Sequence, residues 1–419
     1  MSSQPSAQPL SGYRVLDLTV MTAGPVGTMM LGDIGADVIK IEELHGGELS
    51  RSMGTVYVGN ESANFLSQNR NKRSVRLDLK SNEGRETFLR MAASADVITE
   101  NFRPGTMDRL GIGYESVRAI NPQIVFASIS AFGQNGPYAH LPANDPIIQA
   151  LSGVMAMTGD PDGEPVRMGT PVPDFNAAAL LAFSVTAAIL HRERTGQGQR
   201  LELSLLGATV FGTLPRDGET FITGKAPPRL GSGHPSFCPY RNFRSNDNVL
   251  FFLACFTEKF WSSLCKALDR PDLATDSRSA TNVARCANRA FVDAELQAEF
   301  DGHGGDELLE LLARFNVPAA RVQDLVQALR DDPQIRHNHS VIEVEHPTAG
   351  RFEMLALPVN FHGSPVQYKR SAPRLGEHTI EILGEFGFSS DELEHLLAAR
   401  IIAGIDKDEN RTMPRETNA

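Results

Sequence analysis

Cysteine and tryptophan are scarce in this chain, which has four cysteines and one tryptophan among its 419 residues. No two cysteines form a C-x-x-C pair, and all four fall within one short stretch, as Cys238, Cys255, Cys265 and Cys286. In a chain of this size, that pattern argues against a disulfide scaffold and predicts reduced, mostly buried thiols. The length allows a large apolar core and suggests two domains.

Membrane and nucleic-acid signals are also lacking. No apolar run approaches the length expected of a bilayer-spanning helix. The N-terminal MSSQPSAQPLSG has neither a hydrophobic secretory core nor an Arg-rich amphipathic pattern. We therefore expect a cytoplasmic protein with no membrane partner. The formal charge of −11 argues against nucleic acid binding, yet a local basic patch for a phosphorylated ligand is compatible with it.

The first half of the sequence alternates short apolar strands with helix-like segments. Such alternation is typical of an α/β protein with a parallel sheet covered by helices. The Ala- and Leu-rich stretch 174–192 predicts the longest helix, which ends at a Gly-containing turn before a strand at 200–205. We expect further strands at 15–19, 38–42, 97–100 and 124–129, and helices at 26–34 and 84–94.

Composition changes between residues 213 and 248, where Gly, Pro, Asn and Ser dominate. We interpret this stretch as a linker and functional loop that leads into a second domain. That domain is expected at 249–325, with one strand at 249–254 followed by helices. Short strands at 341–345 and 352–357 come next, and the polar end at 404–419 predicts a disordered tail.

The turn after the first strand, Met21-Thr22-Ala23-Gly24-Pro25, opens a helix. Glycine beside proline at a helix start allows close backbone approach and leaves N–H groups suited to an anion. Neither G-x-G-x-x-G nor G-x-x-x-x-G-K-[ST] occurs in the sequence, so ordinary dinucleotide and P-loop sites lose support. Strand-to-helix turns with glycine are common, and an ordinary turn is the competing interpretation.

The densest basic cluster is Arg70-Asn71-Lys72-Arg73 with Arg76. Arginine and lysine together suit clustered phosphates, because arginine binds as a fork and lysine as a point charge. The alternative is a solvated basic turn before a strand at 75–79.

Asp174 lies at the start of the longest predicted helix. An aspartate there is an ordinary N-cap whose carboxylate accepts hydrogen bonds from first-turn amides. A carboxylate at a helix start in an apolar cleft can also act as a nucleophile. Asp145, before another helix, has the same two interpretations. His337 and His339 lack further ligands at metal-site spacing, and no G-x-S-x-G elbow indicates a serine hydrolase.

Several segments, taken in order over residues 10–400, form one pattern, which resembles the class III CoA-transferase family that includes formyl-CoA transferase and carnitine CoA-transferase. The segments are LDLTVMTAGPVGTMMLGDIGADVIKIE at 16–42, QNRNKRSVRLDLKSNEGRE at 68–86, ENFRPGTMDRLGIGYE at 100–115, SAFGQNGPYAHLPANDPIIQALSGVM at 130–155, RTGQGQRLELSLL at 194–206, GSGHPSFCPYRNF at 231–243, DPQIRHNHSVIEVEHPTAG at 332–350 and PRLGEHT at 373–379.

The resemblance implies a doubly wound parallel-sheet large domain, built from N- and C-terminal segments, plus a smaller α+β domain. The large domain would comprise 10–212 and the C-terminal part of 326–403, with the linker at 213–248 and the small domain at 249–325 between them. It further implies an interlocked homodimer and no permanently bound cofactor. Coenzyme A, as acyl-CoA, and a small carboxylic acid would be the substrates.

The resemblance also implies a mechanism, in which Asp174 attacks an acyl-CoA thioester and forms aspartyl anhydride and aspartyl-CoA thioester intermediates. Asp145 matches an acidic residue beside that nucleophile. Gly231 and Gly233 match a glycine loop over the reacting acyl group. The neighbouring His234 either takes part in the reaction or is only a loop residue that packs against the dimer partner. The positions that match CoA contacts are Val20, Thr22, Ala23, Lys72, Arg73, Asn101, Phe102, Thr106 and Arg109.

Two other functions compete with this one. An α-methylacyl-CoA racemase-like enzyme would need a histidine immediately before the acidic residue, where this chain has Asn144-Asp145 and an offset His140. A non-catalytic CoA-binding protein of the same fold is the other alternative. For the acid substrate, the modest glycine content of the loop disfavours a formyl/oxalate pair. Succinate or another dicarboxylate is the hypothesis, with Arg103, Arg229 or Arg241 meeting its second carboxylate.

Overall fold

The computed structural model describes residues 7–405 and divides into two compact units. The first unit lies within Met1–Ser152, Met168–Leu214 and His337–Ala419, and the second comprises Gly153–Arg167 and Pro215–Arg336. All of the predicted tail except residues 404 and 405 lies outside the described residues.

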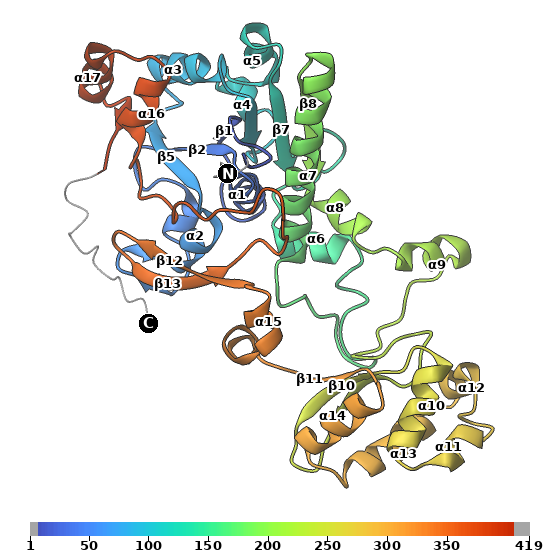
Figure 1. The fold of residues 1–419 in the computed structure, drawn as a ribbon. Helices are drawn as coiled ribbons and strands as arrows, with labels where there is room; N and C mark the ends of the chain where they lie inside the picture. Colours follow the sequence, from blue (N-terminus) through green and yellow to red (C-terminus); the bar gives the residue numbers. More distant parts are fainter. Residues whose placement is uncertain (1–6, 406–419) are drawn as a thin grey trace, which may run out of the picture. The chain divides into compact units, whose positions relative to one another are not determined.

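The first unit is built on a seven-stranded sheet in the order β14-β5-β2-β1-β6-β7-β8, which is parallel except for the edge strand β14. This confirms the α/β class with a mostly parallel sheet. The C-terminal segment rejoins the N-terminal part where β14 pairs with β5 (Figure 1). The strands are β1 (Arg14–Asp17), β2 (Asp37–Glu42), β5 (Lys72–Leu77), β6 (Val97–Glu100), β7 (Val125–Ser130), β8 (Gln199–Ser204) and β14 (Ile402–Ala403).

Strand order reverses between β1 and β6. From β1 the chain moves outward through β2 and β5, then returns to the other side of β1 and continues through β6, β7 and β8. In open α/β sheets, ligands bind outside the carboxyl ends of the strands at such a switch point. We therefore expect a ligand-binding site at the turns after Asp17 and Glu100.

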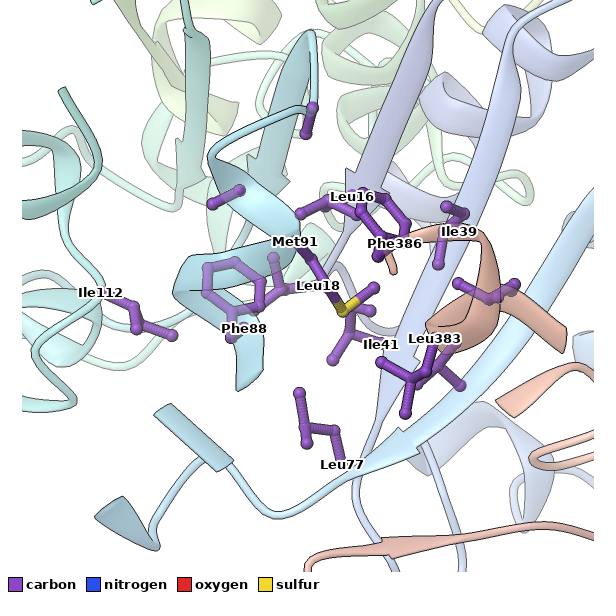
Figure 2. Close-up of a cluster of buried hydrophobic side chains, with 14 of the residues drawn as sticks. Leu16, Leu18, Ile39, Ile41, Leu77, Phe88, Met91, Ile112, Leu383 and Phe386 are labelled. Atoms are coloured by element: carbon purple, nitrogen blue, oxygen red, sulfur yellow. The ribbon is translucent and has the colours of Figure 1, made fainter. Parts of the chain in front are cut away.

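Both faces of the sheet are covered, which explains why its central strands are buried along nearly their whole length. On one face, Leu16 and Ile39 meet Phe88 and Met91 of α3 (Asn82–Ala92) and Leu383 of α16 (Thr379–Glu385) (Figure 2). On the other face, the alternate residues of β1 and β2 pack with α1 (Ala23–Asp33) and α7 (Val172–Thr195). Because successive side chains of a strand point to opposite faces of the sheet, β1 and β2 each contribute to two separate cores.

The longest helix, α7, corrects one expectation from the sequence. By length and composition alone it could cross a membrane, with a mean hydropathy of 1.5 over its most apolar window, although no apolar run was expected to reach that length. Leu181 and Val185 of α7 are fully buried against Leu31 of α1 and Val125 of β7. This packing makes α7 part of the core, but it covers only part of the helix, and Phe183 and Leu190 are exposed.

The C-terminal part of the first unit adds an antiparallel hairpin of β12 (Val341–His346) and β13 (Gly350–Leu355), close to the strands expected there. The other elements of this unit are η1 (Leu49–Arg51), β3 (Tyr57–Val58), β4 (Glu61–Ser62), α2 (Ala63–Gln68), α4 (Thr106–Arg109), α5 (Tyr114–Ile120), α6 (Asp145–Leu151), α8 (Leu205–Phe211), α15 (Pro333–His337, whose last residue alone falls in this unit) and α17 (Ser390–Ala398).

The second unit has a three-stranded antiparallel sheet, β11-β10-β9, whose Phe251 packs with Trp261, Val292 and Leu308 of the helices. It takes in residues 153–167 and much of the stretch expected to be a linker, because β9 pairs with β10. Its elements are α9 (Arg216–Thr223), β9 (Tyr240–Arg244), β10 (Leu250–Ala254), α10 (Glu258–Ala267), α11 (Pro271–Thr275), α12 (Asn282–Ala287), α13 (Arg289–Phe300), α14 (Gly305–Arg314), β11 (Ala319–Arg321) and η2 (Gln327–Asp331).

Candidate active site

A pocket of about 450 Å³ opens beside the carboxyl ends of β6 and β7. It brings together three of the predicted CoA contacts, Asn101, Phe102 and Arg109. The lining also includes residues that the sequence did not assign to CoA, and these are Arg103, Pro104, Ser130, Ala131 and the segment from Ala139 to Ala143. The segment from Ala139 to Ala143 ends two residues before Asp145.

Two arginine side chains line this pocket. Arg103 and Arg109 are both exposed, and the Arg109 guanidinium donates to the Thr106 hydroxyl over 2.8 Å. Among the described residues, Arg103 has no acidic side chain within ion-pairing distance. Exposed guanidinium groups without carboxylate partners are suited to phosphate oxygens.

Val20, the first predicted contact in the β1–α1 turn, is joined to the pocket through Asn101. The Val20 N–H donates to Asn101 Oδ1 and Asn101 Nδ2 donates to the Val20 carbonyl, each over 2.8 Å. Thr22 is the N-cap residue of α1, and among the described residues its side chain makes no capping hydrogen bond. The turn after β1 and the turn after β6 thus form one surface.

Gly24 explains why this turn needs glycine. A Cβ at Gly24 would lie 2.2 Å from the Cβ of Thr19, which is closer than two carbons can approach. The start of α1 therefore packs directly on the end of β1, as the glycine–proline pattern indicated.

Glu100, at the end of β6, is a buried carboxylate that sequence analysis did not single out. Its Oε2 accepts a hydrogen bond from the Phe102 N–H over 2.8 Å. Burial raises the pKa of Glu100 to about 7. Its position next to Asn101, at the carboxyl end of a central strand, was the available signal.

Asp174 lies in the first turn of α7, and the helix begins two residues earlier than expected, at Val172. Proline in the first turn of a helix fits, because its missing N–H would have no partner there. Asp174 is therefore not the N-cap; that position is held by Pro171, without a side-chain capping bond. The predicted cap, with a carboxylate tied to helix amides, is wrong.

The environment of Asp174 instead opposes ionisation. Its side chain is half-buried, and the buried Asp145 carboxylate accepts from the Asp174 N–H over 3.5 Å. Burial and the charge of Asp145 raise the pKa of Asp174 to about 6. Gln149 Nε2 donates to Asp145 Oδ1 over 2.6 Å and thereby fixes the second carboxylate. Two neighbouring carboxylates with one raised pKa are typical of a catalytic site.

Comparison with known proteins places these features in a family. Residues 10–379 match the model of CoA-transferase family III. The chain belongs to CoA-transferase family III. The α/β fold described above is therefore the fold of a CoA-transferase.

Related sequences and a solved structure align with this chain over nearly its full length. Succinyl-CoA:glutarate CoA-transferase from Mus musculus is 36% identical over 399 residues, covering 95% of this chain and 91% of that one. Acetyl-CoA:oxalate CoA-transferase from Acetobacter aceti is 37% identical over 380 residues, covering 90% and 96%. A CAIB/BAIF family protein from Brucella suis is 34% identical with a TM-score of 0.81, covering 91% of this chain and 100% of that one.

The structure does not bring Lys72 and Arg73 to the CoA-transferase pocket. Lys72 is fully buried, and its ammonium group lies 2.9 Å from Asp17 Oδ2, 2.8 Å from Asn69 Oδ1 and 2.9 Å from the Pro25 carbonyl. Burial lowers the pKa of Lys72 to about 8. A phosphate could reach this cation only by displacing Asp17.

The other arginines of the basic cluster are also occupied. Arg73 bonds to Asp37 and to Glu381 and Glu385 of α16, and Arg70 forms a buried ion pair with Asp33. The cluster is neither a solvated turn nor an open phosphate site. It holds β5 to β2 and to the C-terminal helix, so its charges are structural.

The glycine loop, with Gly231 and Gly233, lies in the second unit. Gly231 has φ of +57°, a left-handed conformation that favours glycine, and its N–H donates to the Gly159 carbonyl over 3.0 Å. Gly233 donates to the Leu230 carbonyl over 2.7 Å. His234 stacks on Phe237 with ring centres 4.6 Å apart.

Two arginines proposed for a second carboxylate have other partners. The Arg229 guanidinium lies 2.9 Å from the Gly163 carbonyl, and Arg241 lies 2.7 Å from Asp293. Arg103 lines the pocket at the carboxyl ends of the strands. Among the residues that the structure describes, no group of three or more His, Cys, Asp or Glu side chains is arranged to hold a metal.

Proposed function

We propose that this CoA-transferase moves coenzyme A from an acyl-CoA to a free carboxylic acid, with Asp174 as the nucleophile. The observation that carries the proposal is the pair of Asp174 and Asp145. Within the described residues, the Asp174 carboxylate accepts no hydrogen bond, and burial together with a neighbouring negative charge destabilises its ionised form. Such a carboxylate is a stronger nucleophile than a solvated one.

In the proposed sequence, an Asp174 oxygen attacks the thioester carbonyl, and the C–S bond breaks to release CoA thiolate. The product is a mixed anhydride of Asp174 and the donor acid. The thiolate then attacks the aspartyl carbonyl, the donor leaves as a carboxylate, and an aspartyl-CoA thioester forms. An acceptor carboxylate attacks that thioester, and the released thiolate attacks the acceptor carbonyl, which restores Asp174.

Asp145 would favour each acylation of Asp174. While both carboxylates are ionised, their repulsion raises the energy of the free enzyme. Forming an anhydride or thioester removes the charge on Asp174 and so relieves that repulsion. The Gln149 hydrogen bond keeps Asp145 in place. Asp145 is in this proposal a positioning and electrostatic residue.

Coenzyme A would bind in the pocket at the switch point. Its phosphates would meet the Arg103 and Arg109 guanidinium groups, and its adenine or pantetheine part would contact Phe102. The support comes from the exposure of both cations and from their common pocket. The assignments of Val20, Thr22, Ala23 and Thr106 stay predictions, whereas Lys72 and Arg73 are not retained.

For the acid substrates, we propose a dicarboxylate, with succinyl-CoA as a donor. The support is the name of the Mus musculus relative, succinyl-CoA:glutarate CoA-transferase. The Acetobacter aceti relative, an acetyl-CoA:oxalate CoA-transferase, adds oxalate to the acceptors worth testing, although the glycine loop had disfavoured it. Arg103 is the remaining candidate for a second carboxylate from the sequence hypothesis.

The test of this function is a matrix of acyl-CoA donors and free acids, scored for exchange by liquid chromatography. We expect transfer from succinyl-CoA to at least one dicarboxylic acid such as glutarate, mesaconate or oxalate. Transfer restricted to monocarboxylic acids would remove the dicarboxylate proposal. Exchange of the α-hydrogen with deuterium, with no change in acyl partner, would favour racemase-like chemistry.

The pH dependence of kcat/KM provides a second expected outcome. Because the ionised Asp174 is the nucleophile and its pKa is raised to about 6, kcat/KM should fall as pH drops through 6 and level off above it. Asp145→Asn removes the neighbouring negative charge and should move this acidic limb to lower pH. A limb that stays in place in Asp145→Asn would assign the titration to another group, with Glu100 the first candidate.

We also propose a homodimer, as the family resemblance implies. Its support is an exposed apolar surface on neighbouring helices of the first unit, because large exposed patches of this kind mark interfaces. Light scattering should give twice the mass of one chain; the mass of a monomer would contradict the proposal. The exposed residues are Ile147 and Leu151 of α6, Phe183 and Leu190 of α7, and Val210, Phe211 and Leu214 in and after α8.

A further inference from the structure

The pairing of Asn101 with Val20 extends the sheet beyond its last backbone bonds. The parallel ladder between β1 and β6 ends with Asp17 opposite Thr99, after which the Leu18 N–H donates to the Thr99 carbonyl over 2.8 Å. Two residues further on, the Asn101 carboxamide pairs with both the N–H and the carbonyl of Val20. A side chain thus replaces backbone at the switch point.

The backbone is strained at Met21, directly after Val20. Met21 has φ of +71°, in the left-handed region that is unfavourable for a non-glycine residue. Such conformations persist only where surrounding contacts impose them, and they concentrate at functional sites. This one turns the chain from β1 into the open first turn of α1.

Thr19, the residue before Val20, is held by hydrogen bonds with two buried charged side chains. The Thr19 N–H donates to Asp17 Oδ1 over 2.9 Å, and Lys40 Nζ donates to the Thr19 carbonyl over 2.8 Å. Asp17, Thr19 and Lys40 are all buried. The turn is therefore anchored at Thr19 by the buried charges and at Val20 by Asn101, with the strained Met21 immediately after both anchors.

We propose that Asn101 is a positioning residue, which holds the β1–α1 turn in its left-handed conformation against the CoA pocket. It acts on the ligand through Val20 rather than by recognising coenzyme A with its carboxamide. One N–H and one oxygen lone pair of that carboxamide pair with Val20, so the β1–α1 turn fixes the orientation of the side chain. The inference rests on the proposed function only in taking the pocket as the acyl-CoA site.

Three variants test this role, namely Asn101→Ala, Asn101→Asp and the double variant Asn101→Ala with Met21→Gly. Losing two hydrogen bonds should lower kcat/KM for acyl-CoA about tenfold to a hundredfold in Asn101→Ala. Asn101→Asp keeps an acceptor for the Val20 N–H but loses the donor to the Val20 carbonyl. Its kcat/KM should lie between those of the wild type and Asn101→Ala. Glycine adopts the left-handed region freely, so the double variant should recover about fivefold or more relative to Asn101→Ala.

Hydrogen–deuterium exchange of the free protein tests the same role without any turnover. In Asn101→Ala, peptides covering residues 18–22 should exchange faster than in the wild type, while the buried strands β2 and β7 exchange as before. If Asn101→Ala does not fold, Asn101→Asp serves for the same comparison.

The outcomes separate this inference from the proposed function. Faster exchange at 18–22 in a protein that transfers no CoA would leave the role of Asn101 intact and remove the function. Unchanged exchange at 18–22 would overturn the role of Asn101. So would a rise in KM alone that Met21→Gly does not reverse, since it would identify Asn101 as a direct ligand contact.

Discussion

Replacing Asp174 with asparagine should abolish CoA transfer while leaving the protein folded. Asparagine keeps the size of the side chain but is a poor nucleophile, so the covalent route closes, and exchange should fall by about 10⁴-fold or more. CoA binding should persist, because Asp174 does not line the pocket with Arg103 and Arg109. The measurements are steady-state exchange between acyl-CoA and acid and, separately, CoA binding by calorimetry.

The same substitution should not lower thermal stability. When the pKa of a carboxyl group is raised in the folded protein, the protein becomes less stable as pH rises through that pKa. Ionised Asp174 therefore destabilises the fold at pH 7. Asparagine removes that charge and its repulsion with Asp145. The control is Asp391→Asn, an exposed aspartate in the first turn of α17, which should retain full exchange. Retained exchange in Asp174→Asn would contradict the proposal.

Replacing Lys72 with methionine should remove a large fraction of the protein's stability rather than weaken CoA binding. Methionine is similar in length and apolar, but it leaves buried Asp17 without its nearest cation. Removing one partner of a buried ion pair costs about 3–5 kcal/mol. Differential scanning calorimetry should show a clearly lower transition temperature. Lys80→Met is the control, because Lys80 lies 3.0 Å from Glu43 but both side chains are exposed, and such pairs contribute about 0–1 kcal/mol.

The pH dependence of the Lys72→Met defect has a definite sign. Although burial alone raises the pKa of Asp17, Lys72 and Lys40 lower it overall, so its ionised form stabilises the wild type and that contribution is lost as pH falls. Without Lys72 the pKa of Asp17 should rise, and the stability gap to the wild type should narrow at lower pH. Normal stability with a raised KM for acyl-CoA would instead place Lys72 at the CoA site.

The general architecture could be predicted from the sequence because short strands rich in apolar residues, such as Val97–Glu100 and Val125–Ser130, alternate with helix-like segments. The rest depends on pairings between distant residues. The partners of Arg70 and Lys72 are Asp33 and Asp17, which lie 37 and 55 positions away and become neighbours only in the assembled sheet. A local sequence pattern does not distinguish a lysine or arginine in a buried ion pair from one that binds phosphate.

The site itself was predictable in part. Asn101, Phe102 and Arg109 line one pocket as expected, and Arg103, expected at the acid substrate, lines it too. Ser130 was missed, although it ends β7, the strand next to β6. The error at Asp174 had a readable signal, because Pro173 beside it is typical of the first helical turn and moves the cap outward. The raised pKa of Asp174 had none, since it depends on burial in the folded protein and on Asp145 lying alongside.

The central claim is that Asp174 becomes covalently linked to coenzyme A. The most direct measurement is intact-protein mass spectrometry of the wild type after brief incubation with succinyl-CoA, and then peptide mapping. We expect a CoA thioester confined to Asp174, which is replaced by a hydroxamate at the same residue when hydroxylamine is added. Rapid CoA exchange with no adduct at Asp174, or with an adduct at another residue, would contradict it.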